Sequence, residues 1–326
     1  MKKSVFLLPV LVLFLFVLSC TDSKEPLPEP ESFKSELFVS GLKSPIGIAP
    51  DDHGNIWVSE AGTGNKDGSV AMISPSGTKT TFVTGLTSIF MEGSFEGVGH
   101  VLYRNGKLYF THGVEGKLFT ADVSTFKSGD KAANLDDIQS EDVGTFIKSL
   151  ALSTPLNSNA YNLAFGPDDH LYIVDSGSNA IIKKDKTSGK LSLFAHFPDV
   201  ATKVEAVPTC VAYDGEKFLV STLTGFPFTP ENAKIFQVDN DGNVSEYKSK
   251  FTTLTGITLS ANNKPIVIQH GVFGAMGFGA ETGKVLDENG KVLLDNISRP
   301  NDIKRAGDKT YYLLSYEDGT ISKLSF

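Results

Sequence analysis

A unit of two short apolar strands joined by a polar turn recurs six times along this chain of 326 residues. The clearest copies read PIGIAPDDHGNIWVSEAGTG at 45–64 and AYNLAFGPDDHLYIVDSGSN at 160–179. Weaker copies begin at Val98, at 208 and 255, and at 300. Within each copy apolar and polar residues alternate with period two, and turns rich in Asp, Asn and Gly separate the strands. Repeats of roughly 40–60 residues with about four short strands each are typical of a β-propeller.

The two ends of the chain indicate how many blades there are. The last copy, at 300–326, has room for only three strands, whereas ELFVSGL at 36–42 matches TFVTGL at 81–86 in the first copy. An N-terminal strand that completes the C-terminal blade removes two open sheet edges. We therefore predict an all-β fold over 33–326: a six-bladed β-propeller closed by an N-terminal strand completing the last blade. A β-sandwich would not need the repeated register, and an open solenoid would need a capping element.

The first twenty residues are typical of an exported protein. An apolar run at 5–18 follows two lysines and precedes a serine and Cys20, which is the order of a secretory signal. The sequence VLSC at 17–20 also resembles the bacterial lipobox, whose cysteine is lipidated. We predict a lipoprotein signal peptide at 1–19 and, at 20–32, a lipidated Cys20 followed by a flexible, Pro- and Glu-rich tether. The expected location is a bacterial membrane, most simply the outer membrane of a Gram-negative cell.

Charge and cysteine content narrow the classes of partner. The formal net charge is −8, and no stripe of basic residues interrupts it. Nucleic acid is therefore not an expected partner. Apart from Cys20 the chain has one cysteine, Cys210, inside an apolar strand, so we expect no internal disulfide and a small buried side chain there.

Alignment of the six copies predicts one face for ligand binding. If the first strand of each copy runs along the central channel and the second returns, the first strand begins where the second ends. The second strand ends in a polar residue in every copy. The candidate ligand-binding residues are Glu60, His112, Asp175, Thr222 and Gln269 at these strand ends, the adjacent His270, and His100, Tyr161, Asn162, Asn301 and Asp302 where first strands begin. For Glu60 and Asp175 a structural hydrogen bond to the following turn is the alternative.

Three irregular segments interrupt the repeats. TGFPFTP at 224–230, with Phe226 and Phe228, and GVFGAMGFG at 271–279 place aromatic side chains beside the candidate face. Such side chains are typical of a pocket wall for an apolar or aromatic ligand, unless the two loops pack on each other. The polar segment at 124–144, which contains the most helix-like stretch of the chain, is predicted to be a surface excursion.

A divalent cation is the alternative occupant of the channel mouth. Ca²⁺ or Zn²⁺ needs carboxylate or imidazole groups that converge within about 2–2.5 Å of one ion. Glu60, His100, His112 and Asp302 come from different copies and could meet over the channel, but no HExxH or CxxC motif is present. We therefore expect no cofactor, with a Ca²⁺ or Zn²⁺ ion as the alternative.

Several of these motifs resemble a known family. VPTCVA at 207–212, LTGFPFTP at 223–230, EAGTG at 60–64 and NAYNL at 159–163 are similar to sequences of the ScyD/ScyE family. The resemblance covers most of the chain from about Phe38 and implies an exported six-bladed propeller of the NHL-like type. Named members of that family belong to the gene cluster for scytonemin, an indolic pigment, and the resemblance implies no catalytic residues.

The chain also resembles the gluconolactonase and paraoxonase group, which hydrolyses lactones with a metal at the channel mouth. Those enzymes carry an Asn and an Asp directly after the proline that begins two of their first strands. Here the corresponding positions hold Ile46, Thr209 and Asn301, and only Asn301 fits. Without the acid, a metal-activated water would lack a ligand. We therefore predict a membrane-anchored module that binds a small molecule or a protein, with a metal-dependent hydrolase or lyase of the lactonase or streptogramin-lyase type as the alternative.

Overall fold

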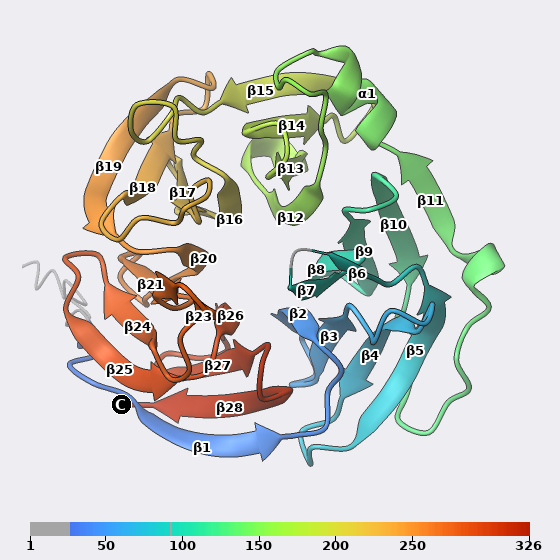
Figure 1. Ribbon diagram of the computed structural model, residues 1–326. Helices are drawn as coiled ribbons and strands as arrows, with labels where there is room; N and C mark the ends of the chain where they lie inside the picture. The colour runs from blue at the N-terminus through green and yellow to red at the C-terminus, as the bar shows by residue number, and fades with distance from the viewer. Residues whose placement is uncertain (1–26, 92) are drawn as a thin grey trace, which may run out of the picture.

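A ring of antiparallel sheets makes up the computed structural model, which describes residues 27–91 and 93–326 (Figure 1). Six four-stranded sheets surround a central axis as the blades of a propeller. The predicted six-bladed, almost entirely β fold is therefore confirmed. The predicted signal peptide at 1–19 and Cys20 lie outside the described residues.

Each blade begins at the axis and adds its strands outward. Blade 1 consists of β2 (Pro45–Pro50), β3 (Ile56–Glu60), β4 (Gly68–Ile73) and β5 (Lys79–Leu86). Blade 2 consists of β8 (Val98–Arg104), β9 (Lys107–His112), β10 (Lys117–Asp122) and β11 (Gln139–Asp142). Blade 3 consists of β12 (Ala160–Phe165), β13 (Leu171–Asp175), β14 (Ala180–Lys184) and β15 (Leu191–His196), with the 3-10 helix η2 (Pro167–Asp169) between its first two strands.

The remaining blades follow the same order. Blade 4 consists of β16 (Pro208–Tyr213), β17 (Phe218–Thr222), β18 (Ala233–Val238) and β19 (Val244–Phe251). Blade 5 consists of β20 (Leu254–Leu259), β21 (Pro265–Gln269), β24 (Gly283–Asp287) and β25 (Val292–Ile297). Blade 6 consists of β26 (Pro300–Arg305), β27 (Thr310–Ser315) and β28 (Thr320–Ser325), with β1 (Lys34–Val39) as its outermost strand.

Strand β1 closes the ring as predicted. It pairs antiparallel with β28, so that the first and last strands of the propeller share one sheet. Just before β1, the ring of Phe33 lies 5.1 Å from that of Tyr311 and 5.8 Å from that of Phe326. Phe33 is thus buried against Tyr311 of β27 and against Phe326, the residue after β28. The closure is therefore held by side-chain packing as well as by hydrogen bonds.

The hydrophobic core is divided among the junctions between blades. Trp57 of blade 1 and Phe110 of blade 2 belong to one buried cluster, and Tyr172 of blade 3 and Phe218 of blade 4 belong to another. Similar clusters fill the other junctions. Because each sheet is buried on both faces by its neighbours, the blades hold the strand ends at the axis in fixed positions.

The segment at 124–144 is more than the predicted surface excursion. It contains the 3-10 helix η1 (Leu135–Asp137) and the outer strand of blade 2, β11, and the short helix α1 (Gly144–Ser149) follows. On its way out the segment runs along β5, where the Ala133 N–H donates to the Phe82 carbonyl at 2.7 Å (Figure 1). The prediction missed β11 because a long connection separates this strand from β10, its partner.

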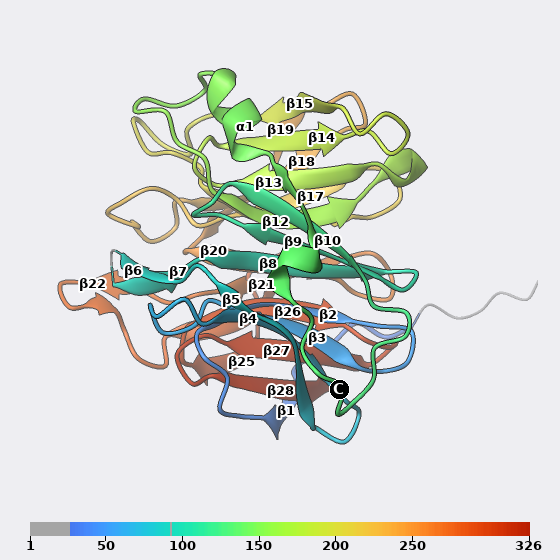
Figure 2. The same cartoon turned by 90° about the vertical axis from the view of Figure 1, so that its right-hand side faces the viewer.

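Two hairpins project from the same face of the ring (Figure 2). One, β6 (Ile89–Met91) and β7 (Ser94–Glu96), connects blade 1 to blade 2; the other, β22 (Phe273–Gly274) and β23 (Gly277–Phe278), lies within blade 5. Both are inserted at the face where the innermost strands begin. They therefore surround the mouth of the channel rather than extend a blade.

The described end of the predicted tether lies on the opposite face. The Asn262 amide donates to the Leu27 carbonyl at 2.7 Å, and the Ser260 hydroxyl donates to the Glu29 carboxylate at 2.9 Å. Both partners belong to the turn that joins the end of β20 to the start of β21, away from the two hairpins. Among residues 27–91 and 93–326, no helix is long and apolar enough to cross a bilayer.

Candidate functional site

Every innermost strand carries a β-bulge at its beginning. In β2 the pairing with β3 shifts between Pro45 and Gly47, which leaves Ile46 without a partner. The same shift occurs at the matching place in β8, β12, β16, β20 and β26. A bulge bends the strand and changes the direction of the side chain at the extra residue. The residues at this position are Ile46, Gly99, Tyr161, Thr209, Thr255 and Asn301, and all but the glycine line a cavity.

Hydrogen bonds between blades form a ring at the level of these bulges. The Ser59 hydroxyl of blade 1 donates to the Gly99 carbonyl of blade 2 at 2.7 Å, and the Asn301 amide of blade 6 donates to the Ile46 carbonyl of blade 1 at 2.7 Å. The other junctions are bridged by Thr111 to Tyr161 at 3.0 Å, Ser176 to Pro208 at 2.6 Å, Thr209 to Leu254 at 2.9 Å and Thr255 to Pro300 at 3.0 Å. The bulge residues thus form a rigid floor.

A cavity of about 850 Å³, the mouth cavity, lies above this floor. Its walls come from the hairpin β6–β7, the loop 223–230 and the hairpin β22–β23. A concave site of this size, with apolar walls and a few polar groups, is typical of sites that bind small organic molecules. Both predicted aromatic segments, at 224–230 and 271–279, are therefore at the face chosen from the repeat register.

Four phenylalanines form one wall of the mouth cavity. The ring of Phe228 lies 5.0 Å from that of Phe273 and 5.5 Å from that of Phe278, and Phe226 lies 5.9 Å from Phe273. Phe226 is nevertheless 75% exposed, and Met276 at the hairpin tip is fully exposed. The two loops pack on each other and still present apolar surface at the cavity. Their role as a wall for a ligand stays a prediction.

Arg299 forms the polar side of the cavity. Its side chain donates to Ser94 at 3.2 Å, to Glu317 at 3.2 Å and, through Nε, to His270 at 3.1 Å. Its guanidinium lies 4.7 Å from the ring of Tyr316, whose hydroxyl accepts the N–H of the β7 residue Phe95 at 2.8 Å. These contacts fasten the hairpin β6–β7 to blade 6, across the mouth of the channel.

The imidazole of His270 is held neutral beside this arginine. Burial and the charge of Arg299 lower the pKa of His270 to about 3, against a weaker opposing effect from its hydrogen bond to the Pro300 carbonyl. Nδ1 lies 3.0 Å from that carbonyl, and Nε2 accepts from Arg299. Both ring nitrogens are therefore engaged, and His270 orients Arg299 rather than offering a free base.

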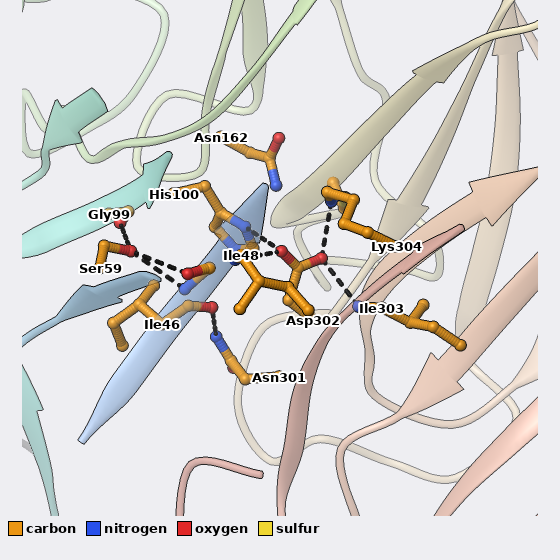
Figure 3. Close-up of polar contacts among 12 residues, drawn as sticks. Ile46, Ile48, Ser59, Gly99, His100, Asn162, Asn301, Asp302, Ile303 and Lys304 are labelled. Carbon is orange, nitrogen blue, oxygen red and sulfur yellow. Dashed lines mark hydrogen bonds and ion pairs between the residues drawn. The ribbon is translucent and has the colours of Figure 1, made fainter. Parts of the chain in front are cut away.

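A buried polar group lies on the axis below the floor (Figure 3). The Asp302 carboxylate accepts from the Ile48 N–H of blade 1 at 2.9 Å and from the Lys304 ammonium at 2.7 Å, and His100 Nδ1 of blade 2 lies 3.3 Å away. His100 Nε2 and the Asn162 amide nitrogen are buried without hydrogen-bond partners among the described residues. Asp302 therefore joins three strands at the axis.

The charges of this axial group are balanced. Burial alone would raise the pKa of Asp302, but the Lys304 ammonium and the hydrogen bonds from His100 and Ile48 lower it to about 2. Burial lowers the pKa of His100, although Asp302 opposes the shift. One carboxylate thus faces one ammonium, and the imidazole between blades is neutral.

The predicted site residues fall into three groups. Those that line the mouth cavity are Tyr161, Phe226, Phe228, His270 and Asn301. Those in the axial group are His100, Asn162 and Asp302, which are buried outside the cavity lining and lie near one another in Figure 3. The third group comprises Glu60, His112, Asp175, Thr222 and Gln269, which are buried at the ends of the second strands and lie outside the cavity lining.

The buried strand-end residues have hydrogen-bond partners within the protein. Glu60 accepts from the Lys43 N–H at 2.7 Å and forms an ion pair with Lys79 at 2.5 Å. His112 Nε2 lies 3.0 Å from the Thr87 carbonyl. Asp175 accepts from the Ser158 hydroxyl and the Ser178 N–H. Thr222 bonds the main chain of Lys234, and the Gln269 amide donates to the Thr282 carbonyl. Their polarity is therefore explained by internal hydrogen bonds.

The four residues considered as metal ligands do not converge. His100 and Asp302 lie together, but Lys304 occupies the other side of the carboxylate, and Glu60 and His112 have the separate partners just described. Within residues 27–91 and 93–326, no group of three or more His, Cys, Asp or Glu side chains is placed to hold a metal ion. These four side chains therefore do not form one cation site.

Sequence reasoning missed part of the cavity. Arg299 immediately precedes Pro300, Tyr316 directly follows Ser315, and Glu96 ends the hairpin β6–β7. Arg299 and Tyr316 are each one residue away from positions that the alignment of the six copies compared. They therefore lie on the predicted face, although the alignment did not include them. The hairpin β6–β7 could not be found by comparing the repeats. Among the described residues, the connection between blades 1 and 2 is the only connection between blades that contains such a hairpin.

The fold and the mouth cavity define a six-bladed β-propeller with an apolar-walled site at one end of its axis. Among solved structures, the fold is similar to that of virginiamycin B lyase from Staphylococcus aureus, with 14% identity, a TM-score of 0.53 and coverage of 90% of this chain and 100% of that one. It is also similar to a streptogramin B lyase, with 16% identity, a TM-score of 0.57 and coverage of 90% and 97%. A gluconolactonase-like protein shares it with 11% identity, a TM-score of 0.57 and coverage of 91% and 93%.

Sequence comparison adds no family. No protein-family model matches the chain, and no curated protein is similar to it in sequence. At identities this low, the structural likeness shows the fold alone. The resemblance to the ScyD/ScyE family therefore stays a prediction.

Proposed function

We propose that this chain is an exported, lipid-anchored binding protein whose mouth cavity holds a small molecule with apolar, aromatic surface. The observation that carries the proposal is the cavity itself: four phenylalanine rings face a floor fixed by hydrogen bonds between blades. The exposed positions of Phe226 and Met276 at its rim leave apolar surface for a ligand to cover. Rigid floor and apolar wall together favour binding without rearrangement of the blades.

A neutral fluorescent probe tests the binding proposal. We expect N-phenyl-1-naphthylamine, whose emission rises in apolar surroundings, to bind saturably, and Phe228→Ala to weaken binding about tenfold because it removes the ring at the centre of the wall. Leu193→Ala is the matched control, since Leu193 is exposed on the outer strand β15. Equal affinity in the wild type and Phe228→Ala would contradict the proposal, as would absence of saturable binding.

The lipid anchor is tested separately. The lipobox-like VLSC at 17–20 motivates it, and the described end of the tether bonds the face opposite the mouth cavity, which would leave the cavity open to solvent on an anchored molecule. We expect cells that express the full chain to incorporate labelled palmitate and to retain the protein in the membrane fraction. Cys20→Ala should abolish both signals, whereas Cys210→Ala should abolish neither. Unlabelled, soluble wild-type protein would refute the anchor.

A metal-dependent hydrolase or lyase is the second candidate, favoured by the fold shared with virginiamycin B and streptogramin B lyases. Against it stands the polar side of the cavity, where His270 has both ring nitrogens engaged. Incubation with a streptogramin B or a lactone, with and without added divalent cations, distinguishes the candidates. Turnover that Phe228→Ala reduces would favour the enzyme.

A further inference from the structure

Two methionine side chains are exposed at the mouth cavity, one on each of the hairpins that surround it. Met91, the last residue of β6, is 49% exposed, and Met276, in the turn between β22 and β23, is fully exposed. Both residues line the cavity. The other sulfur-containing residues among 27–91 and 93–326 are Met72 of β4 and Cys210 of β16, and both are buried. An oxidant that reaches this part of the chain from solvent therefore meets sulfur at the mouth.

The two hairpins are packed through their phenylalanines. The rings of Phe273 and Phe278 lie 5.1 Å apart, and those of Phe90 and Phe95 are also 5.1 Å apart. These edge-to-face contacts do not involve the exposed thioether groups. A polar atom added to the sulfur therefore leaves the packing of the hairpins intact.

Oxidation of such a thioether requires only a peroxide as co-reactant. A lone pair of the sulfur attacks one oxygen of hydrogen peroxide, and the S–O bond forms as the O–O bond breaks. The leaving hydroxide takes the remaining proton from the transferred oxygen and becomes water. The sulfur is oxidised by two electrons, the peroxide is reduced, and the product is methionine sulfoxide. Because susceptibility follows exposure, the two methionines at the mouth react first.

We propose that Met91 and Met276 are oxidation sites at which conversion to sulfoxide weakens the binding of apolar molecules in the mouth cavity. A ligand that covers the new sulfoxide oxygen removes its water without supplying a hydrogen-bond donor. Methionine sulfoxide reductases restore the thioether, so the change is reversible. The oxidation itself is independent of the proposed function, whereas its effect on binding rests on that function.

Peptide mapping by mass spectrometry tests the oxidation sites. The folded, full-length protein is exposed briefly to hydrogen peroxide, which catalase then removes. We expect the peptides with Met91 and Met276 to gain one oxygen at least about tenfold faster than the peptide with Met72, which is buried. In protein unfolded by urea the three rates should agree within about twofold, because burial no longer protects Met72. Equal rates in the folded protein would overturn the proposal.

Probe binding tests the effect on the cavity. N-phenyl-1-naphthylamine should bind the oxidised protein about fivefold more weakly than the untreated protein, and reductases for both sulfoxide epimers should restore the affinity. The double variant Met91→Leu/Met276→Leu should lose no affinity on peroxide treatment. Each variant is compared with its own untreated sample, so any effect of the substitutions themselves does not enter. Met72→Leu is the matched control and should show the same loss as the wild type.

The outcomes separate this inference from the function on which part of it rests. If the untreated protein binds the probe and Phe228→Ala weakens binding, but oxidation of both methionines leaves the affinity unchanged, the proposed switch is wrong and the binding site stands. A loss of affinity that persists in the double variant would equally overturn the switch, because oxidation would then act elsewhere. If the untreated protein shows no saturable binding, the proposed function fails and the switch fails with it.

Discussion

Asp302→Asn is expected to lower the free energy of unfolding by about 1–3 kcal/mol, because the partly exposed Lys304 ammonium loses its carboxylate partner and one buried main-chain N–H beside it loses its acceptor. Asp302 is fully buried and bonds main-chain or side-chain groups of blades 1, 2 and 6. The amide keeps the size of the side chain but removes the charge that faces the ammonium. Chemical denaturation at neutral pH, followed by tryptophan fluorescence and circular dichroism, measures the change.

Two further variants define the cause of this loss. Asp308→Asn, in an exposed turn of the same blade, should shift stability by less than about 0.5 kcal/mol. Lys304→Met should be destabilising alone, but the double variant with Asp302→Asn should be less unstable than the sum of the two single variants. Additive effects would show that Asp302 and Lys304 act independently, and a neutral Asp302→Asn would refute the role of the axial group.

The blades were predictable because their signals are local. Strand alternation, turn residues and the match between 36–42 and 81–86 all lie within short stretches of sequence, and they give the six blades and the closure by β1. In each blade the first strand begins on the face where the second strand ends, because the two strands are antiparallel. The pairing of Pro45 with Glu60 is an example. The loops at 224–230 and 271–279 follow from the same register, because each is inserted where a second strand ends.

The chemistry of the site was harder to predict because it depends on partners far apart in the chain. The partner of Glu60 is Lys79, two strands outward, and that of His112 is the Thr87 carbonyl in the connection from blade 1. A polar strand end with such a partner looks the same in sequence as one that faces a ligand. The bulges add one residue per strand, which sends Tyr161 toward the cavity and leaves Asn162 below the floor. Alternation alone does not show such an insertion.

Stability is expected to fall as the pH is lowered from about 6.5, well before most carboxylates titrate. His270 has a pKa of about 3 in the folded chain, whereas an unfolded histidine titrates near 6.5. The folded pKa is depressed, so the unfolded state takes up the proton first and the stabilisation is lost as pH decreases toward 3. Burial lowers the pKa of His100 and His112 in the same direction. Unfolding free energies at pH 7.5, 6, 5 and 4 measure the slope.

His270→Gln isolates the share of one imidazole. Between pH 7.5 and pH 4 the variant should lose about 3 kcal/mol less than the wild type, which is 1.4 kcal/mol for each pH unit below 6.5. The comparison uses slopes, so any loss of stability that the substitution itself causes at pH 7.5 does not enter. His53→Gln, in an exposed turn on the opposite face, should keep the wild-type slope. If His270→Gln also keeps it, His270 is protonated in the folded chain and does not accept the Arg299 N–H, and the polar side of the mouth cavity would carry one more positive charge.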